Sequence, residues 1–286
     1  MARPEIVALV NRKGGCGKTS GCFHLSGGFA VAGKRTLLVD LDPQASLTQG
    51  FLGPQATEEL DKGQTIASLF DNRFDPEPAD LIVPTGFERI DLVPGANVLD
   101  DYNVPRPQES GNLQFALRTF LNEIADGYDI ILLDCPPNLH LCSWTALTAA
   151  THVLIPFQAE DFGSQGITHI QRAFDQALGR TNPRLRLLGY LVTMFDKRLA
   201  VQTAYERLLR EMYGDQVFHE TMPMASAFKE AVSARSPVTH YKAKSPASVS
   251  VRRIVEEMQA RFEALRGRPP MFLTRSTVLA AAEAGS

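Results

Sequence analysis

The sequence predicts an α/β fold in which a mostly parallel, twisted sheet carries helices on both faces. Three observations lead to this prediction. Strand-like and helix-like segments alternate along the chain. The runs at 5–10 and 128–134 are apolar at nearly every position, as in strands that are buried on both faces. The length of 286 residues, 44% of them hydrophobic, suits one large α/β domain.

The elements follow one another in a regular order. Strands are expected at 5–10, 35–40, 89–95, 128–134, 152–157 and 186–195, and helices at 18–33, 111–126, 142–150, 164–179, 199–213, 225–234 and 247–266. Residues 53–80 are rich in proline and glycine, with one short helix starting at the cap residue Thr65. Pro269 and Pro270 end the last helix, so we expect one domain over 1–267 and a flexible tail over 268–286.

Composition excludes several classes of protein. The net charge of −3, from 29 basic and 32 acidic residues, excludes a globally basic nucleic-acid binder but not a basic patch. No apolar run approaches the roughly 20 residues that cross a bilayer. Four cysteines in a chain of this length make no disulfide framework, and no C-x-x-C pair is present. These features indicate a protein of the reducing cytoplasm.

The strongest motif is NRKGGCGKTS, at 11–20, between the first strand and the first helix. Glycines let backbone N–H groups turn onto phosphate oxygens, and the helix N-terminus adds partial positive charge. Lys18 would reach the β- and γ-phosphates, and the Thr19 hydroxyl would bind Mg²⁺. The expected nucleotide-binding residues are Gly14, Gly15, Cys16, Gly17, Lys18, Thr19 and Ser20. The alternative is an ordinary glycine turn before a helix.

Acidic residues follow two other buried strands. Asp40 and Asp42 stand in LLVDLDPQAS, and Asp134 ends the strand YDIILLD. Carboxylates beside a phosphate are unfavourable unless a metal or a water needs them, and open α/β sheets bind ligands at this edge. The sequence therefore predicts a magnesium site there; the alternative is acids that merely cap strand ends.

The phosphate motif departs from G-x-x-x-x-G-K-[ST], because Arg12 replaces its first glycine and Lys13 precedes the two glycines that follow. The form K-G-G-x-G-K-T resembles the deviant Walker A box of the ParA/MinD family of P-loop ATPases, and the likeness to Soj-type ParA proteins covers about residues 4–265. The resemblance implies a P-loop NTPase fold that hydrolyses ATP with Mg²⁺. The alternative is that Lys13 is an ordinary solvent-exposed lysine of the loop.

The family assigns roles to the matching residues. By this resemblance, Lys13 reaches the ATP of a partner subunit, and Asp42 orients the attacking water. Asp40 supports the magnesium shell, and Asp134 is the Walker B carboxylate. The catalytic residues are thus expected to be Lys13, Lys18 and Asp42, and the metal residues Thr19, Asp40 and Asp134. The guanine-reading motif N-K-x-D is absent, since the nearest segment is FDKR, so ATP is favoured, with adenine near Pro223.

Charge is unevenly distributed along the chain. Residues 224–268 carry nine basic and four acidic side chains, a net +5, whereas residues 1–223 carry −8. We expect a DNA-facing surface, because non-specific DNA binding uses lysines and arginines on phosphates. The candidates are Arg198, Lys229, Arg235, Lys242 and Lys244. Met224 and Ala225 stand where the family usually has Arg-Asn, so one usual DNA contact is missing, and the alternative is a solvated basic helix.

The resemblance implies a complete function. ATP would close a homodimer that binds DNA non-specifically, and a ParB-like or other adaptor would stimulate hydrolysis, so that DNA or another cargo is partitioned or positioned. The protein would be cytoplasmic and nucleoid-associated, without a membrane partner. The alternative is a MinD-like, membrane-associated spatial regulator. An iron–sulfur ATPase is disfavoured because the spacing of Cys135 and Cys142 does not match.

Overall fold

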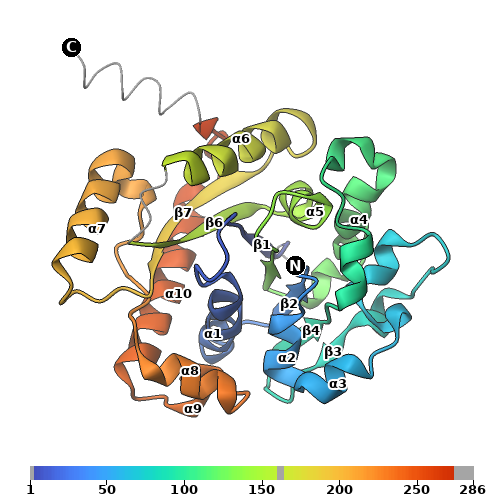
Figure 1. Ribbon diagram of the computed structural model, residues 1–286, viewed down its shortest axis with the longest axis horizontal. Coiled ribbons are helices and arrows are strands. Elements are labelled where there is room, and N and C mark those ends of the chain that lie inside the picture. The colour runs from blue at the N-terminus through green and yellow to red at the C-terminus, as the bar shows by residue number, and fades with distance from the viewer. Residues whose placement is uncertain (1–2, 160–163, 274–286) are drawn as a thin grey trace.

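The structure is a computed structural model that describes residues 3–159 and 164–273. A seven-stranded sheet forms its centre, with the strand order β3-β4-β2-β5-β1-β6-β7. All pairings are parallel except that of the two-residue edge strand β3 with β4. The predicted α/β architecture with a mostly parallel sheet is therefore confirmed (Figure 1).

The elements lie close to the predicted ranges. The strands are β1 (Glu5–Leu9), β2 (Thr36–Asp40), β3 (Val83–Pro84), β4 (Ile90–Val93), β5 (Ile130–Asp134), β6 (His152–Gln158) and β7 (Arg186–Thr193). The α-helices are α1 (Lys18–Val31), α2 (Ser46–Leu52), α3 (Pro54–Glu58), α4 (Ala116–Ile124), α5 (Leu141–Ala149), α6 (Ser164–Arg180), α7 (Ala200–Tyr213), α8 (Ser226–Ser233), α9 (Val238–Tyr241) and α10 (Pro246–Leu265).

Helices cover both faces of the sheet and form two cores. Alternate residues of each strand point to opposite faces: Val7 and Leu9 belong to one core, whereas Ala8 belongs to the other. The first core packs against α1, α2, α8, α9 and α10, and the second against α4, α5, α6 and α7. This arrangement explains why the central strands read as continuous apolar runs.

The free edge of β7 is partly covered by the segment at 217–224. Phe218 N donates to Tyr190 O at 2.9 Å, and Met222 N donates to Val192 O at 2.9 Å. Isolated parallel bridges join Tyr190 to Val217 and Phe195 to Pro223. This segment therefore acts as an irregular continuation of the sheet and protects its edge.

Several short elements differ from the expectation, since β3, α2, α3 and α9 have no counterpart in it. Helices α2 and α3 were not predicted, because Gly50, Gly53 and Pro54 interrupt the pattern, and the expected helix at Thr65 is a 3₁₀ helix, Ile66–Phe70. Gly53, with φ of 87°, separates α2 from α3. Phe51 lies 4.5 Å from the Phe23 ring, centroid to centroid, so tertiary packing stabilises α2 where local propensity does not.

The start of the predicted tail packs on the domain. Leu273 is buried, and its N–H donates to Asp175 Oδ1 at 2.7 Å. Phe272 packs against the core cluster that contains α6. The rest of the predicted tail, 274–286, lies outside the described residues. Within the described ranges, no helix is both long and apolar enough to cross a membrane.

Candidate functional site

The predicted phosphate and magnesium motifs meet at one edge of the sheet. The strands β2, β5 and β1 are neighbours, and in their register Asp134 pairs with both Asp40 and Leu9. The loop that follows β1 contains the glycine-rich motif and leads directly into α1. All three motifs therefore lie at the carboxyl ends of adjacent parallel strands, the usual ligand-binding edge of such a sheet.

The glycine-rich loop has the backbone that a phosphate cradle requires. Gly15 and Gly17 have φ of 74° and 91°, in the left-handed region where a side chain would be strained. Lys18 is buried, and its Nζ donates to the backbone oxygen of Lys13 at 3.0 Å, across the loop. Cys16 is buried in the loop, and burial raises the pKa of its thiol, so Cys16 is an unreactive small side chain.

Residues outside the motif hold this loop in place. Thr193, the last residue of β7, donates its hydroxyl to Cys16 O at 2.8 Å. Gln158, at the end of β6, donates to Gly15 O at 3.2 Å. Asn11 donates to Pro156 O at 2.7 Å and accepts from Lys13 N at 3.0 Å. The carboxyl ends of β6 and β7 therefore brace the phosphate loop from its far side.

Asp40 is held by a dense set of hydrogen bonds. Its Oδ2 accepts from the backbone N–H of Thr48 at 2.9 Å and from the Thr48 hydroxyl at 2.7 Å, and its Oδ1 accepts from Asp42 N at 3.2 Å. Burial raises the pKa of Asp40 to about 6, and these hydrogen bonds oppose the rise. The backbone of Gly95 can lie close to Asp40 only because Gly95 has no side chain, since a Cβ there would lie 2.8 Å from Asp40 O. Asp40 thus fixes the loop that carries Asp42 to α2.

Asp134 has very different surroundings. It is fully buried, and neither carboxylate oxygen accepts a hydrogen bond from the described residues. Burial raises its pKa well above the ordinary value, and the nearby Asp40 raises it further, while Thr19 and Lys18 act in the opposite direction. A buried carboxylate without donors is costly, and a cation beside it would remove that cost.

These residues fit Mg²⁺ bound together with a nucleotide. Thr19 and Asp134 offer oxygen atoms at the N-terminus of α1, where backbone N–H groups also favour anionic phosphates. Among the residues described, no group of three or more His, Cys, Asp or Glu side chains could hold a metal ion. Mg²⁺ is commonly bound by one or two protein oxygens together with substrate phosphates and water, which matches the few oxygen ligands that this site offers.

The catalytic candidates Lys13 and Asp42 are more accessible. Lys13 is exposed at the start of the cradle, whereas Asp42 is half-buried in the loop after β2 and accepts from Gln44 N at 3.0 Å. Ser20 is half-buried in the first turn of α1. The two side chains assigned to γ-phosphate chemistry thus lie in loops on either side of the rigid end of β5.

The predicted DNA-binding residues are divided between two regions. Lys229 lies on α8, and Arg235 lies in the turn after α8. Lys242 and Lys244 lie in the turn after α9, whereas Arg198 precedes α7. All five are exposed. The structure thus brings four of them to one continuous segment on the α1 face of the sheet (Figure 1).

Some of these basic groups already have partners. Arg198 binds Asp196 through both carboxylate oxygens, at 2.7 to 3.2 Å, and Lys242 pairs with Glu230. The Arg235 guanidinium packs on Gly53, where a Cβ would lie 2.4 Å from its Cζ. Lys229 and Lys244 make no ion pair with any described residue and are the most available for a phosphate.

Pro223, the predicted adenine neighbour, lies in the segment that continues the sheet beyond β7. Met222 and Met224 exchange backbone hydrogen bonds with Phe195 at 3.1 and 3.0 Å. Thr193, the last residue of β7, contacts the phosphate loop, and Phe195, two residues later, forms a bridge with Pro223. Pro223 therefore lies on the ligand-binding side of the sheet. Its contact with adenine stays a prediction.

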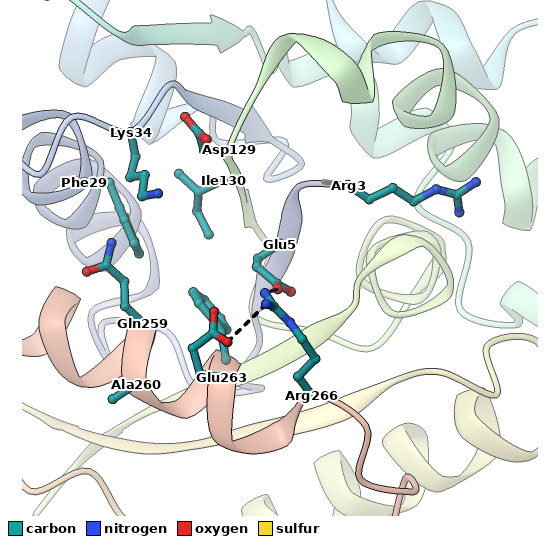
Figure 2. A pocket seen from close by; sticks show the side chains of 11 residues that line it. Arg3, Glu5, Phe29, Lys34, Asp129, Ile130, Gln259, Ala260, Glu263 and Arg266 are labelled. Atoms are coloured by element: carbon teal, nitrogen blue, oxygen red, sulfur yellow. Dashed lines mark ion pairs between the residues drawn. The ribbon is translucent and has the colours of Figure 1, made fainter. Parts of the chain in front are cut away.

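A separate cavity of about 440 Å³ lies at the opposite, amino end of β1 (Figure 2). Arg266 crosses it to pair with Glu263 at 3.1 Å and with Glu5 at 3.6 Å. Phe29 and Ile130 form part of its wall. None of the predicted site residues lines this cavity, so it is not the nucleotide site.

Sequence reasoning did not identify the supports of the site. Thr48, Thr193 and Gln158 hold Asp40 or the phosphate loop, but they stand outside the quoted motifs or were not singled out. A polar residue at the carboxyl end of a buried strand is a possible signal for Thr193 and Gln158. Thr48 has no comparable signal, because its role depends on how α2 folds back onto β2.

Comparisons with known proteins agree with this geometry. A family model described as an AAA domain matches residues 4–187. The chain is 35% identical over 268 residues to the chromosome-partitioning ATPase Soj of Thermus thermophilus, covering 92% of this chain and 98% of that one. It is 32% identical over 260 residues to the chromosome partitioning protein ParA of Caulobacter vibrioides, covering 90% and 94%.

Solved structures show the same fold. A cobyrinic acid a,c-diamide synthase from Mycobacterium smegmatis, with bound ADP and magnesium, has a TM-score of 0.76 at 25% identity and covers 94% of this chain and 99% of that one. The cell division ATPase MinD of Pyrococcus furiosus has a TM-score of 0.69 at 22% identity, covering 90% and 98%. The second likeness, below 25% identity, concerns the fold alone.

Proposed function

This chain belongs to the ParA/MinD family of P-loop ATPases, and from that premise we propose that it is an ATP-driven dimer that binds DNA non-specifically and positions DNA or another cargo. It hydrolyses ATP with Mg²⁺ as cofactor. The observation that supports dimerisation is the exposed Lys13 beside the buried Lys18. The phosphate loop contains both lysines: Lys18 is buried and enclosed by the loop, whereas Lys13 is exposed.

Each residue of the site has a separate proposed role in ATP hydrolysis. The N–H groups of Gly14 to Thr19 would bind the phosphates, and Lys18 would neutralise charge that develops on them. Thr19 and Asp134 would hold Mg²⁺, which would neutralise negative charge on the phosphates. Asp42 would orient the attacking water, and Asp40 would hold the Asp42 loop through Thr48. Lys13 of one subunit would reach the nucleotide of the other.

Two observations support a role in partitioning. Two relatives are named as partitioning proteins, and this chain has a basic segment at α8 and α9. We propose that Lys229 and Lys244 contact DNA phosphates, with Arg235, Lys242 and Arg198 as further contacts. The protein would act in the cytoplasm on the nucleoid, and an adaptor of the ParB kind would stimulate hydrolysis. The MinD-like alternative needs a free amphipathic helix, and among the described residues the last long helix, α10, has its apolar face buried against α1.

Dimerisation is tested with an Asp42→Ala variant, which should bind ATP without hydrolysing it. We expect light scattering to show twice the monomer mass with Mg²⁺-ATP and the monomer mass with ADP. Adding Lys13→Ala should abolish the dimer while nucleotide binding persists, because Lys18 and the cradle remain. Arg12→Ala, which changes the adjacent exposed basic residue, is the matched control and should still dimerise. The same mass with ATP and with ADP would refute the ATP dependence of dimerisation.

DNA binding is tested with the same ATP-locked protein in a salt titration. We expect the logarithm of the affinity for random duplex DNA to fall linearly with log salt. Lys229→Gln combined with Lys244→Gln should make this slope shallower by about 1 for each DNA phosphate that the protein no longer neutralises. Arg106→Gln is the control, since Arg106 is exposed on the α4 side of the sheet. Binding to anionic vesicles in place of DNA would instead support the membrane regulator.

A further inference from the structure

We propose that Asn103 is a positioning residue for ATP hydrolysis, because it holds the loop that follows Asp134. Asn103 is buried, lies far from the motifs in sequence, and does not belong to the phosphate cradle. It stands in the connection between β4 and α4, on the α5 side of the sheet. The proposal concerns the turnover step of the ATPase and does not depend on DNA binding.

The contacts of Asn103 converge on the loop at 135–140 and on the start of α5. Its Oδ1 accepts from the backbone N–H of Cys142 at 3.2 Å, and its Nδ2 donates to Asn138 Oδ1 at 3.4 Å. Its backbone oxygen lies 3.1 Å from Nδ1 of His140. The next residue, Val104, accepts from Leu141 N at 3.0 Å.

The loop needs such external support. It starts immediately after Asp134 and includes Pro136 and Pro137, which have no backbone N–H to donate. Asn138 O is held from the α5 side by the Ser143 hydroxyl at 2.6 Å. Within the loop, His140 N donates to Asn138 Oδ1 at 3.1 Å, and Asn103 Nδ2 donates to the same oxygen. Asn103 therefore adds a contact from outside the loop to the one internal hydrogen bond that Asn138 accepts and to the bond from Ser143.

Asn103 is itself anchored by its neighbour. The Tyr102 hydroxyl donates to Asp71 Oδ2 at 2.8 Å, and Lys62 contacts both groups. The Arg73 guanidinium also binds Asp71, with Nη2 at 2.7 Å from Oδ2. This cluster fixes the chain at 102–104, so that Asn103 can transmit a defined position to the loop after Asp134.

The contacts predict which kinetic constant changes. Asn103 touches the loop that begins at the metal-binding Asp134, whereas the phosphate cradle is held by Asn11, Gln158 and Thr193. Loss of Asn103 should therefore loosen the geometry of the γ-phosphate end of the site and leave nucleotide binding intact. A misplaced catalytic group lowers kcat, while weaker ground-state binding raises KM.

The test measures basal kcat and KM for Mg²⁺-ATP in the full chain. We expect Asn103→Leu to lower kcat about tenfold and to change KM by less than about twofold. Asn138→Ala should also lower kcat, and the loss in the double variant should be smaller than the product of the two single losses, because both substitutions remove the Asn103–Asn138 hydrogen bond. Each also removes a bond of its own, from Cys142 N or from His140 N. Retained binding of a fluorescent ATP analogue shows that each variant is folded.

The matched control is Asn182→Leu. Asn182 is also a buried asparagine that bridges loops, since its Nδ2 donates to Leu147 O and Ala150 O at 2.8 and 2.7 Å, at the other end of α5. It should lower thermal stability and leave kcat unchanged. An unchanged kcat in Asn103→Leu, a raised KM with normal kcat, or an equal loss of kcat in Asn182→Leu would each overturn the proposal.

Discussion

Asp40 and Asp134 end neighbouring strands in register, yet their carboxylates differ in what surrounds them. Asp40 accepts three hydrogen bonds from Thr48 and Asp42, whereas Asp134 accepts none from the described residues. Hydrogen bonds compensate the burial of a charge, so the uncompensated charge is concentrated on Asp134. The free protein therefore carries a local destabilisation at the position where the metal is expected.

This difference leads to a prediction for Asp134→Asn. Without nucleotide and metal at pH 8, the free energy of unfolding of the variant should be about 1–3 kcal/mol higher than that of the wild type. The folded wild type must either bury the carboxylate charge or keep a proton that the unfolded chain has lost, whereas asparagine is neutral in both states. Chemical denaturation monitored by circular dichroism measures this difference. The same variant should lose ATPase activity.

Asp40→Asn is the comparison variant. Its carboxylate already has donors in Thr48 and Asp42, and an amide cannot accept from all of them, so the variant should be less stable than the wild type. Equal stability changes in the two variants would contradict the assignment of the uncompensated charge to Asp134.

At the scale of elements, α1 connects the nucleotide site to the basic segment. It begins at the phosphate loop and packs closely on α9 and α10, because Gly27 and Gly28 have no side chains in the way. A Cβ on Gly27 would lie 2.4 Å from Pro237 Cβ, and one on Gly28 would lie 2.9 Å from Val251 Cγ1. His24 adds a buried hydrogen bond, since Val238 N donates to its Nδ1 at 3.2 Å.

The buried His24 predicts an acid sensitivity. Burial lowers the pKa of His24 to about 3, and the Phe228 backbone opposes this effect. Since the unfolded chain binds the proton more tightly, the stabilisation is complete above about pH 6.5 and is lost as the pH falls from there toward 3, by at most about 1.4 kcal/mol per pH unit. His24→Asn, which keeps an acceptor for Val238 N, should show a flatter dependence of unfolding free energy on pH across this window.

The control for this prediction is His219→Asn. His219 is exposed between β7 and α8, so this substitution tests whether a changed slope is specific to the buried His24. An unchanged slope in His24→Asn, measured by urea denaturation at several pH values, would show that another group causes the acid sensitivity.

At the scale of the whole molecule, the nucleotide site and the basic segment occupy different parts of the domain. The phosphate loop and three aspartates occupy the carboxyl edge, and the basic segment on α8 and α9 lies beside α1 on one face. The net charge of −3 thus conceals a net +5 over residues 224–268, which include α8, α9 and α10, in a more acidic body. Two copies brought together by ATP would double this patch without a globally basic protein, which is the physical basis of the proposed nucleotide control of DNA binding.

Much of the fold could be predicted because its signals are local. Buried parallel strands are apolar at consecutive positions, and the phosphate loop needs glycines next to a lysine and a threonine, so β1, α1 and β5 appear directly in the sequence. Helix α2 could not be predicted, because Gly50 weakens its propensity and Phe51 is stabilised only by packing on Phe23. The packing of Leu273 against α6 could not be predicted either, because the sequence of this segment is typical of a flexible tail.

The sequence by itself determined the phosphate loop, the carboxylates at the strand ends and the family, because these depend on residue types at short, fixed spacings. Only the tertiary structure decided which acid is left without donors, that Thr193 and Gln158 brace the cradle, and that Asn103 reaches across to the loop after Asp134. The hydrogen bonds of Thr193, Gln158 and Asn103 join residues more than 30 positions apart in the chain. The order of the strands brings these residues together, so the bonds leave no local pattern in the sequence.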